Sequence, residues 1–207
     1  MMFRVAKSVI AFRGELRRWG SAEAAALVEF AVALPLLIVL VVGIFDFGAA
    51  FNMKQELNNA VREGARFGAA QPTNDWCFSC SSPPSVDAIQ SLVGSYLQAA
   101  KINDCGLSIL PPGSGNGWGS PLTFTYSTSG GCAGTLTLTI CRGGPGCVVQ
   151  ETENFGGVAN PVNLLTTQVT ISYPFQWHFN NVIQLLIPGA KLGLTNVVTQ
   201  ATAVNMD

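Results

Sequence analysis

Charged residues and histidine are scarce in this chain. Its 207 residues include 11 basic and 12 acidic side chains, and His178 is the single histidine. A lone histidine cannot form the usual histidine-rich metal site, and no serine in the sequence stands out as its partner in a nucleophilic set. The sequence also lacks a phosphate-binding glycine loop and paired catalytic carboxylates. We therefore expect no enzymatic activity, no bound metal and no cofactor.

The few basic residues are concentrated at the N-terminus. Five of the 11 lie within residues 1–24, whereas six basic residues face ten acidic ones from Ala25 onward. The positive-inside rule then keeps the N-terminus in the cytoplasm and exports everything after Asp46. Because the exported body is mildly acidic, nucleic acid is not an expected partner.

A long apolar segment follows the basic leader. Residues 30–45 carry no charge, and together with residues 24–29 they approach the ~20 residues that cross a bilayer. A secretory signal peptide is disfavoured, because the leader is long and the small residues precede the apolar run. A plain signal anchor leaves Glu29 unexplained, since an ionisable group at bilayer depth is costly and marks a functional position.

Cysteine is confined to the exported part of the chain. The six residues are Cys77, Cys80, Cys105, Cys132, Cys141 and Cys147. An even number in an oxidising compartment predicts a disulfide framework, whose connectivity the sequence leaves open. The last two flank a Gly/Pro turn and favour a hairpin-closing bridge, which would leave Cys105 with Cys132. The C-x-x-C at residues 77–80 lacks the βαβ context of a redox pair and the second pair of a zinc site, so a structural disulfide is preferred.

Hydrophobic periodicity predicts the secondary structure. One long helix is expected over residues 25–70, apolar all round at first and then amphipathic, with Pro35 inside it. A second amphipathic helix is expected over residues 86–101 and a short helical turn over 179–186. The apolar face of the first helix is predicted to contain Phe47, Phe51, Leu57, Val61, Ala65 and Gly68. Strands are predicted at residues 107–110, 122–127, 135–141, 148–151, 168–173 and 194–204.

These elements indicate an α+β fold. A long N-terminal transmembrane helix packs in its second half on an antiparallel sheet, and the second helix covers part of the same sheet. The expected organisation is a basic leader (1–24), the transmembrane part of the helix (25–46), its extracytoplasmic continuation (47–70) and an extracytoplasmic, Cys-containing domain (71–207).

The order of basic leader, small residues, glutamate, aromatic residue and apolar run resembles the prepilin signal of type IV pilins. Residues 31–37 (AVALPLL), 43–48 (GIFDFG) and 59–66 (NAVREGAR) more specifically resemble the TadE family. These proteins are minor pilins or pseudopilins of the tight-adherence (Flp) pilus. The C-terminal segments 169–175 and 185–188 resemble the family more weakly, and the Cys/Gly-rich middle does not resemble it.

The resemblance implies a prepilin peptidase cut between Ala24 and Ala25, which makes Glu29 the fifth residue of the mature chain. In the family this carboxylate, followed here by Phe30, neutralises an N-terminal ammonium on the same or a neighbouring subunit. The family usually has glycine before the cut, where this chain has Ala24. A cut after Gly20 would make Glu29 the ninth residue and remove the pairing.

The resemblance also implies partners, place and role. Partners would be the peptidase, other pilins or pseudopilins, the inner-membrane pilus assembly platform and membrane lipid. The chain would cross the bacterial inner membrane once, with its domain in the periplasm. It would act in pilus initiation or at the tip and support surface adhesion. The alternatives are a membrane-anchored periplasmic scaffold and a tethered redox or enzyme domain.

Overall fold

The computed structural model describes residues 22–72, 75, 82–115, 122–143, 147–155, 158–186, 189 and 193–206. The chain divides into two compact units, Met1–Ile44 and Phe45–Asp207. The second unit contains a five-stranded antiparallel sheet and the helices that pack on it. This confirms the predicted α+β class.

Helix α1 (Ala22–Ala69) extends through both units and includes Pro35. It confirms the predicted long helix and begins three residues earlier than expected. From Ala25 on it is long and apolar enough to cross a membrane by length and composition, with a mean hydropathy of 2.8 in its most apolar window. None of that window is buried.

Helix α2 (Pro84–Ala99) follows, with proline at its first position, where the missing N–H would have no helical partner. Val86, Ile89, Val93 and Leu97 recur every three or four residues and are completely buried. This spacing places them on one face of the helix and confirms the predicted amphipathic pattern. The helix begins and ends two residues earlier than predicted.

Five strands build the sheet: β1 (Thr123–Thr128), β2 (Leu136–Arg142), β3 (Val148–Phe155), β4 (Val158–Phe175) and β5 (Thr195–Val204). β4 is the central strand, because its second half pairs with β2 on one side and β5 on the other. β1 pairs with β2 at the edge. The predicted strand at residues 107–110 is wrong. These residues form turns, in which Leu107 N–H donates to the Asp104 carbonyl and Leu110 N–H to that of Leu107.

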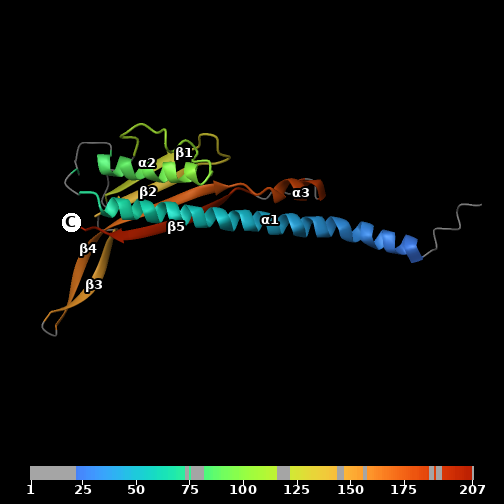
Figure 1. Cartoon of the computed structure of the whole chain (residues 1–207), viewed down its shortest axis with the longest axis horizontal. Coiled ribbons are helices and arrows are strands. Elements are labelled where there is room, and N and C mark those ends of the chain that lie inside the picture. Colours follow the sequence, from blue (N-terminus) through green and yellow to red (C-terminus); the bar gives the residue numbers. More distant parts are fainter. Residues whose placement is uncertain are drawn as a thin grey trace, which may run out of the picture. The chain divides into compact units, whose positions relative to one another are not determined.

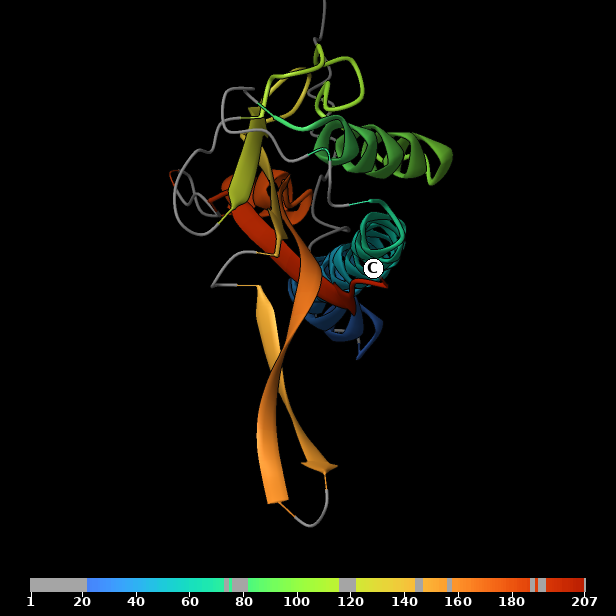
Figure 2. The ribbon, with the colours of Figure 1, turned by 90° about the vertical axis from the view of Figure 1, so that its left-hand side faces the viewer.

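The first half of β4 pairs only with β3, over residues 158–165. The two strands form a hairpin that extends away from the rest of the sheet (Figures 1 and 2). Both strands are longer than predicted, since polar and proline-containing segments continue the ladder on this hairpin. Helix α3 (Phe179–Leu186) then follows β4, as predicted, and precedes β5.

The core lies between one face of the sheet and the two long helices, which cover the same side (Figure 2). The strands contribute Phe124, Tyr126, Leu136, Leu138, Ile140, Val169, Ile171 and Tyr173. The buried apolar residues of α1 begin only at Leu57, so two of its predicted core positions are wrong. Phe47 and Phe51 are 70% and 64% exposed, because the core cluster does not extend to that part of the helix.

Small residues let α1 approach both α2 and the sheet closely. A Cβ at Gly64 would lie 2.8 Å from Val93 Cγ2. A Cβ at Gly68 would lie 2.6 Å from both Ile89 Cδ1 and Thr167 Cγ2. The two glycines therefore bring the backbone of α1 close to its neighbours at the junction of α1, α2 and β4.

Candidate functional site

The first unit presents an apolar helix surface that its own residues leave open. Glu29 is exposed on this helix, and the neighbouring Phe30 is 61% exposed. The other exposed large apolar residues here are Leu27, Val28, Val32, Leu34, Leu36, Leu37, Ile38, Leu40, Val41 and Ile44. A continuous apolar surface of this size marks contact with lipid or with other proteins.

The expected processing site lies in the first turn of this helix. α1 begins at Ala22, so Ala24 and Ala25 are both helical. The basic leader before Ala22 lies outside the described residues. The cut between Ala24 and Ala25 and the charge pairing of Glu29 therefore stay predictions.

Asp46 lies at the start of the second unit and is 5% exposed. One carboxylate oxygen is 3.2 Å from His178 Nδ1, and the other accepts a hydrogen bond from the backbone N–H of Phe179. Phe179 is the first residue of α3, whose own first turn contains no acid. Asp46 therefore caps α3 from a position 133 residues earlier, and its negative charge complements the positive end of the helix.

Aromatic side chains gather around this cap. The ring of Trp177 packs edge-to-face on Phe47 and on Phe175, with ring centroids 5.3 and 5.0 Å apart. Its Nε1–H donates a 2.8 Å hydrogen bond to Thr195 Oγ1 on β5. Trp177 thus links the end of β4, the start of β5 and the exposed start of the second unit.

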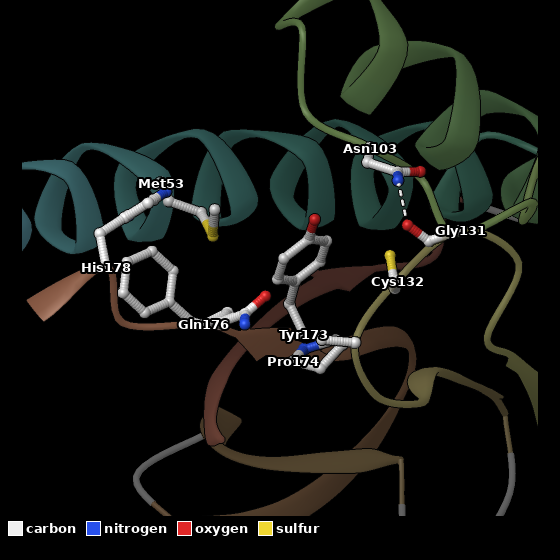
Figure 3. A pocket seen from close by; sticks show the side chains of 10 residues that line it. Met53, Asn103, Gly131, Cys132, Tyr173, Pro174, Gln176 and His178 are labelled. Atoms are coloured by element: carbon white, nitrogen blue, oxygen red, sulfur yellow. Dashed lines mark hydrogen bonds between the residues drawn. The ribbon is translucent and has the colours of Figure 1, made fainter. Parts of the chain in front are cut away.

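A small cavity of about 220 Å³ opens beside these residues. Met53, Asn103, Tyr173, Gln176 and His178 are among its lining residues (Figure 3). Its volume is below the ~300–1,000 Å³ typical of small-molecule sites. Burial is the main cause that raises the pKa of the Tyr173 hydroxyl, and the nearby carboxylate of Asp104 adds to it. The raised pKa keeps the Tyr173 phenol neutral at pH 7.

The ionisable residues Asp87 and Arg142 lie elsewhere and serve the fold. Asp87 accepts hydrogen bonds from Ser82 Oγ at 2.6 Å, Tyr126 Oη at 2.7 Å and the Gly113 N–H at 2.9 Å. Burial raises the pKa of Tyr126, and the contact with Asp87 raises it further. These groups are satisfied within the domain and join the first turn of α2 to β1.

Arg142, at the end of β2, is completely buried. It donates to Ser85 Oγ and, at 2.8 Å, to the carbonyl of Gln71, and it lies 3.9 Å from the carboxylate of Asp75. Its guanidinium thus connects the end of α1, the start of α2 and the sheet. No cluster of three potential metal ligands occurs among the residues that the structure describes.

Two disulfides join cysteines that the structure describes. Cys105 bonds Cys132, which ties the segment after α2 to the β1–β2 loop, and Cys141 at the end of β2 bonds Cys147 just before β3. The Cα atoms of the two pairs are 5.3 and 6.0 Å apart. Both are the pairings that the sequence favoured. Cys77 and Cys80 lie outside the described residues.

The sequence patterns do not predict the contact between Asp46 and His178. They mark Asp46 only as the end of the apolar segment and give His178 no partner. The available signal was that each is the single ionisable group in an otherwise uncharged stretch, residues 45–53 and 174–190. Periodicity cannot pair two residues that are 132 positions apart.

Comparison with known proteins finds a family match in the N-terminal part of the chain. Residues 24–66 match the family described as TadE-like protein, which confirms the resemblance drawn from the residues around Glu29 and along α1. The match covers the apolar helix and the first part of α1 that packs in the second unit. No curated protein and no solved structure matches the chain.

Proposed function

We propose that this protein is a minor pilin-like subunit of a tight-adherence pilus, anchored by a single pass in the inner membrane with its domain in the periplasm. The observation that carries this proposal is the exposed apolar helix with Glu29 near its start, within the segment that matches the TadE-like family. Such a helix can be covered by lipid before assembly and by helices of other subunits in a filament.

Glu29 would act in docking. Prepilin peptidase would cut between Ala24 and Ala25. The new N-terminal ammonium would lie on Ala25, four residues before Glu29, which Phe30 follows. A carboxylate in an apolar environment is stable only when it is paired, and this ammonium on the same or an adjacent subunit is the matching partner. The pairing would fix the axial register of one helix against the next.

The size of the domain supports a role at the tip or in initiation. The second unit, Phe45–Asp207, is a folded domain with its own core, and two disulfides join residues of its described part. Major subunits of this pilus system are small helical proteins, so a domain of this size suits one or a few copies at the end of a filament. Its partners would be other pilins or pseudopilins and the assembly platform, and its effect would be surface adhesion.

The test compares two substitutions on the same helix. Glu29→Ala should leave membrane insertion intact but reduce recovery with sheared pili at least about tenfold, because an unpaired ammonium in an apolar environment costs more than ~1.4 kcal/mol. Glu63→Ala, which removes an exposed acid of the same helix, should preserve both. N-terminal sequencing of the membrane form should give Ala25.

Three results would contradict the proposal. Wild-type recovery of Glu29→Ala in sheared pili would remove the docking role, and a mature chain that begins at Ser21 would remove the charge pairing. A deletion strain with normal pilus number and normal attachment would leave a membrane-anchored scaffold as the better interpretation.

A further inference from the structure

The start of the second unit exposes aromatic side chains where a soluble domain would carry charge. Phe45, Phe47 and Phe51 are 74%, 70% and 64% exposed. Asp46 is the single ionisable residue within residues 45–53, and its carboxylate is buried against the start of α3, 3.2 Å from the exposed ring of His178. Residues 45–53 therefore offer aromatic rings and no exposed charge.

The C-terminal part of the chain brings a second uncharged segment to the same place. His178 is the single ionisable residue within residues 174–190, and it is the one that faces Asp46. Trp177 contacts Phe47 and directs its indole N–H to Thr195. The two ionisable groups thus face each other, and an aromatic residue with a polar N–H lies beside them.

Helix α3 continues this segment. Its sequence, FNNVIQLL, has apolar residues at its first, fourth, fifth, seventh and eighth positions, and the first, fourth, fifth and eighth have the spacing of one helix face. Eight residues are too few for a stable isolated helix, so α3 depends on its surroundings. Asp46 provides part of this support through the Phe179 N–H and fixes the helix beside the start of the second unit.

We propose that these elements form a membrane foot: Phe45, Phe47, Phe51, Trp177 and α3 lie in the interfacial layer of the bilayer. The occupant follows from continuity, because Phe45 directly succeeds the apolar segment that is long enough to span a membrane. Aromatic residues with a polar edge, tryptophan above all, concentrate at this layer, and short amphipathic helices lie in its plane. The foot would hold the folded domain against the membrane at a second point.

The full chain in phosphatidylcholine–phosphatidylglycerol vesicles allows a direct test. Replacing Trp19, Trp76 and Trp118 with Phe leaves Trp177 as the single tryptophan, which can be excited selectively. Its emission should fall at least about twofold when the lipids carry bromine near the headgroup end of their acyl chains, because tryptophan in the interfacial layer lies close to that depth.

Two reporters control this measurement, each built by moving the single tryptophan. In Leu36→Trp, a position 74% exposed on the apolar segment, emission should be quenched by bromine near the middle of the acyl chains. In Ile109→Trp, a position 82% exposed after α2, emission should be the same in brominated and in unbrominated lipid. The foot would be overturned if Trp177 emission were the same in lipid brominated near the headgroup end and in unbrominated lipid, while the tryptophan of Leu36→Trp was quenched. Absence of quenching in Leu36→Trp would overturn the anchor and the foot together.

Substitutions within the foot give an independent measurement. Phe51→Gln with Ile183→Gln should reduce the quenching of Trp177, whereas Ile109→Gln should leave it unchanged. Protection of Trp177 in sheared pili without quenching in vesicles would assign this surface to a protein partner and overturn the lipid contact. The membrane foot depends on the membrane anchor and not on the pilus role. If Trp177 is quenched but the protein never appears in sheared pili, the foot is supported and the filament proposal is contradicted.

Discussion

The closest approach of α1 to its neighbours gives the sharpest prediction for stability. Gly68→Ala would place a methyl group 2.6 Å from Ile89 Cδ1 on α2 and from Thr167 Cγ2 on β4. Carbon atoms in contact are normally ~3.5–4.0 Å apart, so each contact is about 1 Å too short. The two neighbours are both completely buried, and the Thr167 hydroxyl donates to Asn205 Oδ1 at 2.8 Å, which limits how far they can move.

The magnitude follows from two opposing effects. Overpacking of a filled core costs about 1–3 kcal/mol, whereas replacing glycine with alanine inside a helix gains up to about 1 kcal/mol. Because Gly68 is the second-last residue of α1, the gain is smaller there. We expect Gly68→Ala to lower the free energy of unfolding by about 1–2 kcal/mol. Gly64→Ala should cost less, since a single atom, Val93 Cγ2, lies within 3.0 Å of its new methyl group.

The matched control is Gly48→Ala on the same helix, where nothing lies within 4 Å of the new methyl group. Its unfolding free energy should stay the same or rise by up to about 1 kcal/mol. Thermal unfolding of the detergent-solubilised full chain, followed by near-ultraviolet circular dichroism, measures all three. Gly68→Ala should lower Tm by about 2–8 °C. Equal Tm values for Gly48→Ala and Gly68→Ala would refute the close packing of α1 at this junction.

Three further predictions concern the groups that stabilise the domain. Arg142→Met should lower the free energy of unfolding by about 1–3 kcal/mol in urea titrations, because it leaves the Ser85 hydroxyl and the Gln71 carbonyl without their hydrogen-bond donor. Burial acts to raise the pKa of Asp104, but hydrogen bonds from Ser108, Gly106 and Gln98 outweigh it and lower the pKa below its ordinary value. Its contribution to stability is therefore present above about pH 4 and is lost as the pH falls through the lowered pKa, so Asp104→Asn should destabilise the domain at pH 7 and much less at pH 2. Serine substitution of both Cys105 and Cys132, which are 27 residues apart, should lower the free energy of unfolding by about 3.5 kcal/mol in chemical unfolding. The same substitution of Cys141 and Cys147, which are six residues apart, should lower it by about 2 kcal/mol, because the disulfide closes a shorter loop.

Local patterns were enough to predict most elements of this fold. The apolar run and the three-to-four spacing after Leu57 define α1, and alternation of threonine with apolar residues defines β1 and β2. The exposed Phe47 and Phe51 could not be predicted, because they continue the helical spacing that elsewhere marks a buried face. The segment that was predicted as a strand at residues 107–110 has the composition of one, but hydrogen bonds to Asp104 turn it back on itself.

The contacts that join distant parts of the chain were the hardest to foresee. Asp46 and Phe179 are 133 residues apart, and Arg142 reaches Gln71 over 71 residues. Neither contact leaves a periodic signal in the sequence, since each is made by a single charged residue, Asp46 or Arg142, in an otherwise uncharged segment. The bridge between Cys141 and Cys147 was easier, because the Gly/Pro-rich residues between them predict a turn that brings them together, whereas Cys105 and Cys132 were paired only as the remaining cysteines.

The position of the core along α1 bears directly on the proposed pilus role. Among the described residues, every fully packed core residue of this helix lies at or after Leu57, whereas the exposed apolar surface of the first unit ends at Ile44. The two surfaces share no residue. Moving residues 25–44 from lipid to the helices of other subunits would therefore remove no contact from the core of the domain. A subunit that is folded in the membrane and later extracted into a filament needs this separation, because its domain must keep its stability while the surroundings of its anchor change.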